Sequence, residues 1–145
     1  MKMRHLKFLL IFALIMGCSS DDNVNNCNLL VNVSVDVTID LNLPQFNQLN
    51  FPGGVVPLDG EGNGGIFLIR VNNETILAWD GADPNFVLSS CSIMTLDGTN
   101  VRSSCNGGNE FSLFTGGPLG DNPPPCGLKA YRVLPIDAST FVITN

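Results

Sequence analysis

Apolar and polar residues alternate without interruption along residues 31–43. The apolar positions are Val31, Val33, Val35, Val37, Ile39, Leu41 and Leu43, and the polar positions between them are Asn32, Ser34, Asp36, Thr38, Asp40 and Asn42. A period of two over this length predicts a long half-buried strand, with one face on the core and the other in water. Asp36 and Asp40 then lie on the wet face, where solvated carboxylates are commoner than a functional acid pair.

Two further apolar runs occupy residues 66–71 and 75–79. We predict that both are strands. Asn72 and Asn73 lie between them as a short turn, because asparagine tolerates a positive φ angle. Together these segments predict a second piece of sheet.

Residues 44–65 carry three prolines and six glycines, so they are predicted to be loop. Within this segment, Asp59–Gly64 resembles a calcium-binding loop. An EF-hand loop needs a bidentate glutamate at its twelfth position, which is Arg70 here, and a flanking helix, which the pattern does not predict. An acidic glycine-rich turn is therefore the better interpretation.

The fold class follows from the spacing of turns. Short strands alternate with Gly, Pro and Asn turns, and no segment after the first 17 residues has a helical period, which predicts an antiparallel all-β domain. An immunoglobulin-like sandwich is a rival. Its Cys–Trp–Cys order would have to use Cys27, Trp79 and Cys91, and those spacings fit poorly. Trp79 is therefore interpreted as an ordinary core residue.

The N-terminus has the pattern of a secretory signal peptide, residues 1–17. Three basic residues precede the apolar run Phe8–Met16, which is too short to span a bilayer. The segment Leu14–Cys18 resembles a bacterial lipobox, which implies cleavage before Cys18 and lipidation of that cysteine. The following Ser-Ser-Asp-Asp is similar to the export tag of Bacteroidetes surface lipoproteins. We expect a lipidated tether over residues 18–28, a β domain over residues 29–145, and an outer-membrane protein that faces the cell surface or otherwise the periplasm.

Charge and histidine content exclude several function classes. Without the signal peptide the chain has 128 residues (145 − 17) and a net charge of −9 (4 bases − 13 acids). So acidic a chain argues against nucleic-acid binding and against electrostatic attraction to an anionic membrane, which leaves the lipid as the anchor. The single histidine, His5, lies in the signal peptide, so catalytic units and zinc sites that use imidazole are excluded from the mature chain.

Apart from Cys18, four cysteines remain, and an even number in an exported protein predicts disulfides with three alternative pairings. Cys91 and Cys105 flank a predicted hairpin whose turn is Asp97-Gly98, so their ends are expected to meet. Cys27 and Cys126 would then join the tether to a proline-rich loop. Four thiolates on one metal would need clustered spacings such as Cys-x-x-Cys, and none occurs.

The stretch from Trp79 to Gly116 resembles the core of a Rieske-type iron–sulfur domain. That family holds its cluster with a Cys-x-His loop and a Cys-x-x-His loop on either side of a hairpin. The positions that match the cluster ligands are Asp83 and Asn85 in the first loop and Cys105 and Gly108 in the second. Three of the four ligand positions therefore carry a different residue type.

The resemblance extends over roughly residues 66–145 and implies the remaining elements. The segment 110–116 matches the strand and turn after the second loop, and 120–125 matches a proline loop that covers the cluster. Residues 128–133 and 140–144 match the closing strands. The fold implied is a small Rieske-like sandwich or barrel.

A Rieske centre uses two thiolates and two imidazoles, and this chain supplies neither pair at the matching positions. We therefore expect a degenerate domain without cofactor or metal and without catalytic residues, which binds an unidentified protein or small molecule in an envelope lipoprotein. The alternative is an electron-transfer protein with an atypically ligated 2Fe–2S cluster. A thiol–disulfide role for Cys91 and Cys105 lacks the Cys-x-x-Cys arrangement.

Overall fold

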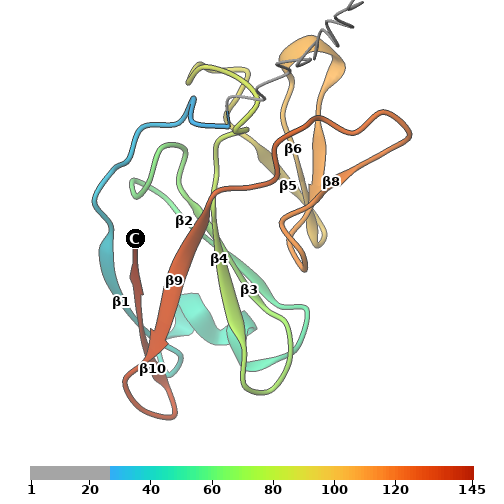
Figure 1. Ribbon diagram of the computed structural model, residues 1–145. Helices are drawn as coiled ribbons and strands as arrows, with labels where there is room; N and C mark the ends of the chain where they lie inside the picture. The colour runs from blue at the N-terminus through green and yellow to red at the C-terminus, as the bar shows by residue number, and fades with distance from the viewer. Residues whose placement is uncertain (1–26) are drawn as a thin grey trace, which may run out of the picture.

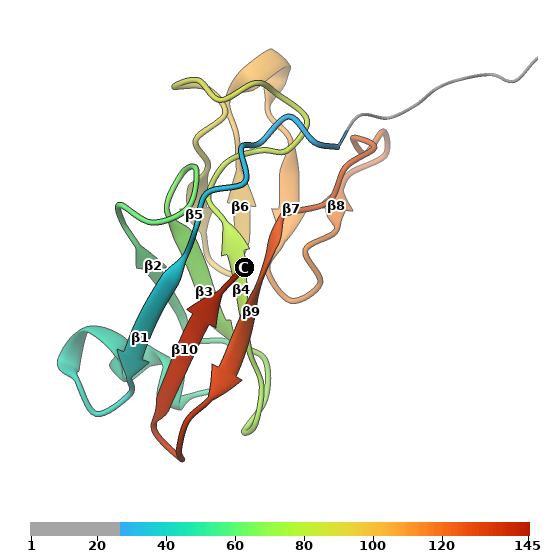
Figure 2. The ribbon, with the colours of Figure 1, turned by 60° about the vertical axis from the view of Figure 1, so that its left-hand side comes forward.

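The computed structural model describes residues 27–145, which form two antiparallel β-sheets (Figures 1 and 2). The prediction of an antiparallel all-β domain is therefore confirmed. The predicted signal peptide, the lipidated Cys18 and most of the tether lie outside the described residues. Within residues 27–145, the helices are too short to cross a membrane.

The larger sheet has six strands and the smaller one has four. The order in the larger sheet is β1 (Asp36–Asp40), β10 (Thr140–Thr144), β9 (Ala130–Pro135), β4 (Ile76–Asp80), β3 (Ile66–Arg70) and β2 (Val55–Leu58). The order in the smaller sheet is β5 (Thr95–Asp97), β6 (Asn100–Arg102), β7 (Glu110–Ser112) and β8 (Pro118–Leu119). The smaller sheet lies between β4 and β9 in the sequence, so its loops are held at one end of the larger sheet (Figure 1).

The two faces of strands β3 and β4 contribute to two different hydrophobic cores. All five residues of β3 are buried. Ile66 and Leu68 pack in a core inside the larger sheet, whereas Phe67 and Ile69 pack in a second core that reaches the smaller sheet. A strand buried on both faces reads as a continuous apolar run, as this one does.

The larger sheet curls around its core. Ile39 of β1 and Val56 of β2 belong to the same cluster although these strands are the opposite edges of the sheet. Trp79 then connects the two sheets, because its indole N–H donates to the Leu113 carbonyl oxygen at 2.7 Å. Gly116 is required beneath it, since a Cβ there would collide with the indole ring.

The predicted long strand at residues 31–43 is only partly correct. Strand β1 covers Asp36–Asp40, where Asp36 pairs with Thr144 at the end of β10. The residues before Asp36 have no backbone partner in the sheet, because β10 ends there. The alternation persists in burial, since Val35 is 1% exposed and Ile39 is fully buried, but Val31 is 63% exposed. The pattern therefore identified the strand and overstated its length.

The prediction that residues 44–65 are all loop is wrong. They contain the 3₁₀ helix η1 (Pro44–Asn50), which buries Phe46 and Leu49, and the edge strand β2. Proline in the first turn of η1 loses no helical hydrogen bond. Pro57 in β2 is exposed on an edge strand, the place where a sheet tolerates proline. The high glycine and proline content of this segment therefore led to a loop prediction and missed these two short elements.

Candidate functional site

The two loops that match the Rieske ligand loops lie next to each other at the top of the smaller sheet. The first loop follows β4, and the second contains the short 3₁₀ helix η2 (Cys105–Gly107), which follows β6. Backbone bonds join them, because the N–H of Ser104 donates to the Cys91 carbonyl oxygen at 2.9 Å. The elements implied by the family resemblance occur in the expected order, including the hairpin of β5 and β6 around Gly98.

Asp83, at the first ligand position, is a fully buried carboxyl group that bonds to both loops. From the second loop it accepts hydrogen bonds from the Ser103 hydroxyl at 2.7 Å and from Asn109 Nδ2 at 2.8 Å. From its own loop it accepts the backbone N–H of Asn85 at 3.0 Å and Asn85 Nδ2 at 2.9 Å. Its oxygens are thus engaged by four protein donors.

Asn85, at the second ligand position, connects the first loop to the proline loop. Its Oδ1 accepts the backbone N–H of Cys126 at 3.0 Å, and its Nδ2 donates to the Cys126 carbonyl oxygen at 3.0 Å. Asp83 and Asn85 together therefore tie three loops into one unit. Every buried side-chain nitrogen and oxygen within residues 27–145 has a hydrogen-bond partner.

Cys105, at the third position, forms a disulfide with Cys91, with the Cα atoms 4.9 Å apart. A second disulfide joins Cys27 to Cys126, with the Cα atoms 5.5 Å apart. Both pairs are those predicted from the sequence. The thiol of Cys105 is consequently consumed in a covalent bond between the two ligand loops.

Gly108, at the fourth position, has no room for a side chain. Its φ angle is +89°, and a Cβ would lie 2.7 Å from the Ser103 carbonyl oxygen. A histidine in this conformation would therefore require the backbone of the second loop to move.

These four residues do not fit a Rieske cluster. The cluster requires two thiolates and two imidazoles, whereas the chain offers one carboxyl group, one amide, one disulfide sulfur and one glycine. Within residues 27–145, no group of three or more His, Cys, Asp and Glu side chains is placed to hold a metal ion.

A second buried carboxyl group, Asp80, organises the glycine-rich loop, and sequence reasoning missed it. It accepts hydrogen bonds from the Tyr131 hydroxyl at 2.6 Å and from Asn63 Nδ2 at 2.8 Å. The backbone N–H groups of Asn63, Gly64 and Ala82 also donate to it. Burial, followed by the bond to Asp80, raises the pKa of Tyr131. The sequence pattern could have indicated its burial, because Asp80 lies on the same buried face of β4 as Ile76 and Ala78.

Sequence reasoning also missed Ser103 and Asn109, which complete the Asp83 network. No local pattern distinguishes them from the other small polar residues of their loop. The calcium interpretation of Asp59–Gly64 gains no support either, because this loop directs Asn63, not a set of carboxylates, toward Asp80.

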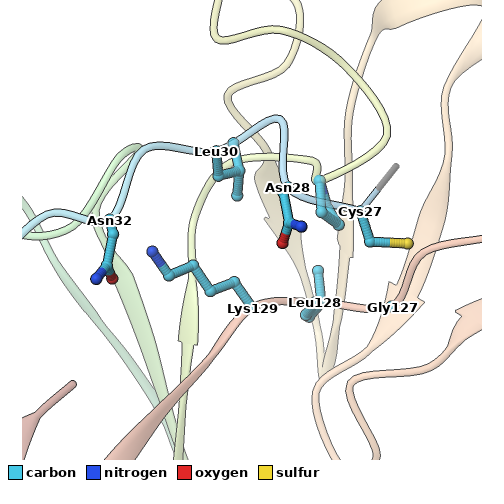
Figure 3. Close-up of a pocket in the computed structure, with 8 residues that line it drawn as sticks. Cys27, Asn28, Leu30, Asn32, Gly127, Leu128 and Lys129 are labelled. Atoms are coloured by element: carbon cyan, nitrogen blue, oxygen red, sulfur yellow. The ribbon is translucent and has the colours of Figure 1, made fainter. Parts of the chain in front are cut away.

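A cavity of about 350 Å³ lies beside this network (Figure 3). Pro84, which stands between Asp83 and Asn85, contributes one part of its wall. The other parts come from residues 127–129 and from Cys27, Asn28, Leu30 and Asn32, so the cavity adjoins both the first loop and the proline loop. A volume of this size is at the lower end of the range for small-molecule sites.

No family model and no curated protein matches this chain. The solved structures that are similar in fold include the following two. One is a chain of the complex of reduced oxygenase and oxidized ferredoxin in carbazole 1,9a-dioxygenase, with 19% identity and a TM-score of 0.47 over 75% of this chain and 93% of that one. The other is a putative NADH-dependent nitrite reductase small subunit from Mycobacterium tuberculosis, with 19% identity and a TM-score of 0.42 over 79% and 97%.

Proposed function

We propose that this chain is a non-catalytic lipoprotein of the cell envelope, in which a degenerate Rieske-like domain serves as a binding or accessory module without a cluster. The observation that carries the proposal is the network around Asp83. The four positions that match cluster ligands carry hydrogen bonds, a disulfide and a glycine.

This network holds the two loops together, as a bound metal does in a metal site. A metal held by two loops also ties those loops together. Here Asp83 joins the two ligand loops through Ser103 and Asn109, and the Cys91–Cys105 disulfide joins them again. Loops held rigidly at one end of a sheet are a common place for binding residues. The module therefore presents three ordered loops without a cofactor to order them.

The residue types of the site do not favour catalysis. The single histidine of the chain is His5, in the predicted signal peptide, so no imidazole is available as a general base. The cysteines of the site are paired in disulfides and provide no thiolate nucleophile.

The proposed location rests on the lipobox-like segment before Cys18 and on the Ser-Ser-Asp-Asp that follows it. Lipidation there would anchor the domain to the outer membrane, with the cell surface as the expected side. Metabolic labelling with a palmitate analogue tests this, since the Cys18→Ala chain should lose the label. Surface proteolysis of intact cells then separates the cell-surface location from the periplasmic one.

The cofactor proposal is tested on residues 19–145, exported to an oxidising compartment. This fragment contains both sheets, both cores and both disulfides. We expect a colourless protein with no bound iron and no free thiol. Stoichiometric iron with a Rieske-type visible spectrum would overturn the proposal in favour of an electron-transfer protein with atypical ligation.

A further inference from the structure

The cavity beside the Asp83 network is formed where the N-terminal segment crosses the end of the proline loop. Residues 27–35, here called the strap, run over residues 127–129 without pairing as a strand (Figure 3). In the figure, Asn28, Leu30 and Asn32 lie on the strap side and Lys129 extends along the opposite side toward Asn32. The cavity therefore has two walls from distant parts of the chain.

The strap is fixed at several points, so the cavity is preformed. The Cys27–Cys126 disulfide holds its start. Asn63 bonds to both the N–H and the carbonyl oxygen of Val31, each at 3.0 Å. Asn145 Oδ1 accepts the N–H of Val35 at 3.1 Å. A ligand that enters this cavity would not have to order its wall, which reduces the entropic cost of binding.

Among residues 27–145, Lys129 is the only charged residue that lines the cavity. Its ammonium group donates to the Val31 carbonyl oxygen at 2.9 Å and lies 5.8 Å from the centroid of the Tyr131 ring. The single ion pair recorded within residues 27–145 is Arg102–Glu110, so Lys129 has no carboxylate partner there. An ammonium group has three N–H donors, and the Val31 bond uses one of them.

The remaining wall is mixed, because Asn28 and Asn32 line it together with three apolar side chains. Leu30 and Leu128 approach from the strap and from the chain beneath it, and Pro84 closes the side next to the Asp83 network. One cation beside a wall that is partly apolar favours a small molecule that has one anionic group and a compact apolar body.

We propose that this cavity binds a small organic monocarboxylate, whose carboxylate group bonds to Lys129 and whose apolar body packs on Leu30, Pro84 and Leu128. The inference deepens the proposed binding function and rests on it. The acidic charge of the chain opposes binding of polyanions at long range, but at physiological salt this repulsion is screened beyond about 8 Å. A single negative charge adjacent to Lys129 therefore meets mainly the local attraction.

The test uses isotope-labelled residues 19–145 and two probes of the same shape, benzoate and uncharged benzamide. We expect benzoate to shift the backbone amide signals of residues 28–32 and 127–129, with a dissociation constant on the order of 1 mM. Benzamide should bind at least about tenfold more weakly, because it lacks the charge that Lys129 recognises.

Substitutions of Lys129 test whether its charge binds the carboxylate. Lys129→Gln should weaken benzoate binding about tenfold or more, whereas Lys129→Arg keeps the charge and should retain it. Arg132→Gln is the matched control, because Arg132 is an exposed cation on β9 that does not line the cavity. The amide spectra of all three variants, recorded without ligand, report whether the fold is intact.

Three results would overturn the inference: equal affinity for benzoate and benzamide, undiminished binding by the well-folded Lys129→Gln variant, or no shift at these residues at roughly 20 mM benzoate. These results are independent of the iron assay. A chain that holds iron and still binds benzoate at Lys129 would refute the cluster-less function and leave the carboxylate site standing.

Discussion

At the scale of single residues, two buried carboxyl groups hold the loops of this domain in place through hydrogen bonds. Asp83 gathers donors from the two ligand loops, and Asp80 gathers donors from the glycine-rich loop and from β9. Removing one partner of a buried hydrogen bond lowers stability by more than the bond itself contributes, because the remaining polar group is buried with neither a protein partner nor water to bond to. These positions are therefore the most sensitive to conservative substitution.

Asp83→Asn should destabilise the domain by about 2 kcal/mol. The substitution places an amide N–H₂ group where donors from Ser103 and Asn109 now point, so at least one bond is lost. Urea unfolding measures the change. Asp97→Asn is the control, because Asp97 is exposed at the hairpin turn and should change stability by less than about 0.5 kcal/mol. Equal stability of both variants would contradict the structural role given to Asp83.

Gly108→Ala should destabilise the second loop more than Gly107→Ala. Both residues have positive φ angles, +89° and +94°, so both substitutions carry backbone strain of about 1–3 kcal/mol. Only at Gly108 would the new Cβ also meet the Ser103 carbonyl oxygen. The difference in unfolding free energy between the two variants isolates this steric contact, and a difference near zero would show that the second loop can accommodate a side chain.

Tyr131 should make stability fall at high pH. The pKa of Tyr131 is raised in the folded state, so its contribution is fully present below the unfolded tyrosine pKa of about 10 and is lost as pH rises from there through the folded pKa. The Tyr131→Phe variant lacks both this titration and the bond to Asp80. It should be less stable than the parent at pH 7, and the gap should narrow above about pH 10. A constant gap measured by urea unfolding from pH 7 to 11 would contradict this assignment.

At the scale of elements, sequence patterns were informative where an element packs locally. The apolar run of β3, the hairpin of β5 and β6 and the turn between β3 and β4 were all predicted near their observed positions. Strand β1 was predicted too long and helix η1 was not predicted, for one reason. Their limits depend on distant partners. Strand β1 begins opposite the residue where β10 ends, and η1 is anchored by the Arg70 bond to the Leu49 carbonyl oxygen at 2.7 Å.

The two disulfides should differ in their contribution to stability. The Cys27–Cys126 bond closes a sequence separation of 99 residues and Cys91–Cys105 one of 14. In the chain-entropy model these loops correspond to about 4.7 and about 3 kcal/mol. Paired Cys→Ser variants, one pair at a time, should reproduce this order in urea unfolding. The reverse order would indicate that the short disulfide acts mainly on the folded loops and not on the unfolded chain.

At the scale of the whole molecule, the two hydrophobic cores share strands β3 and β4. Ile66 and Phe67 are adjacent in sequence but belong to the two different cores. The indole of Trp79 adds a direct bond from β4 to Leu113, beside the smaller sheet. Neither core can lose its packing without disturbing the strands that supply the other.

Unfolding should therefore be a single cooperative transition. Trp79 is the only tryptophan and contacts both sheets, so its fluorescence reports on the region between them. We expect the fluorescence transition and the far-ultraviolet circular dichroism transition to coincide in urea, as two-state unfolding requires. Separate midpoints would show that the smaller sheet unfolds on its own.

The sequence by itself predicted the all-β class, the central hairpin and both cysteine pairs, and it determined which residue types stand at the four positions that resemble Rieske ligands, because these depend on local periodicity, turn chemistry and residue counts. Only the tertiary structure decided which partners these four positions have. Asp83 meets Ser103 and Asn109 across 20 and 26 residues, and Asn85 meets Cys126 across 41. Such bonds depend on which loops the sheets bring together, and small polar residues in loops carry no periodic signal of their partners.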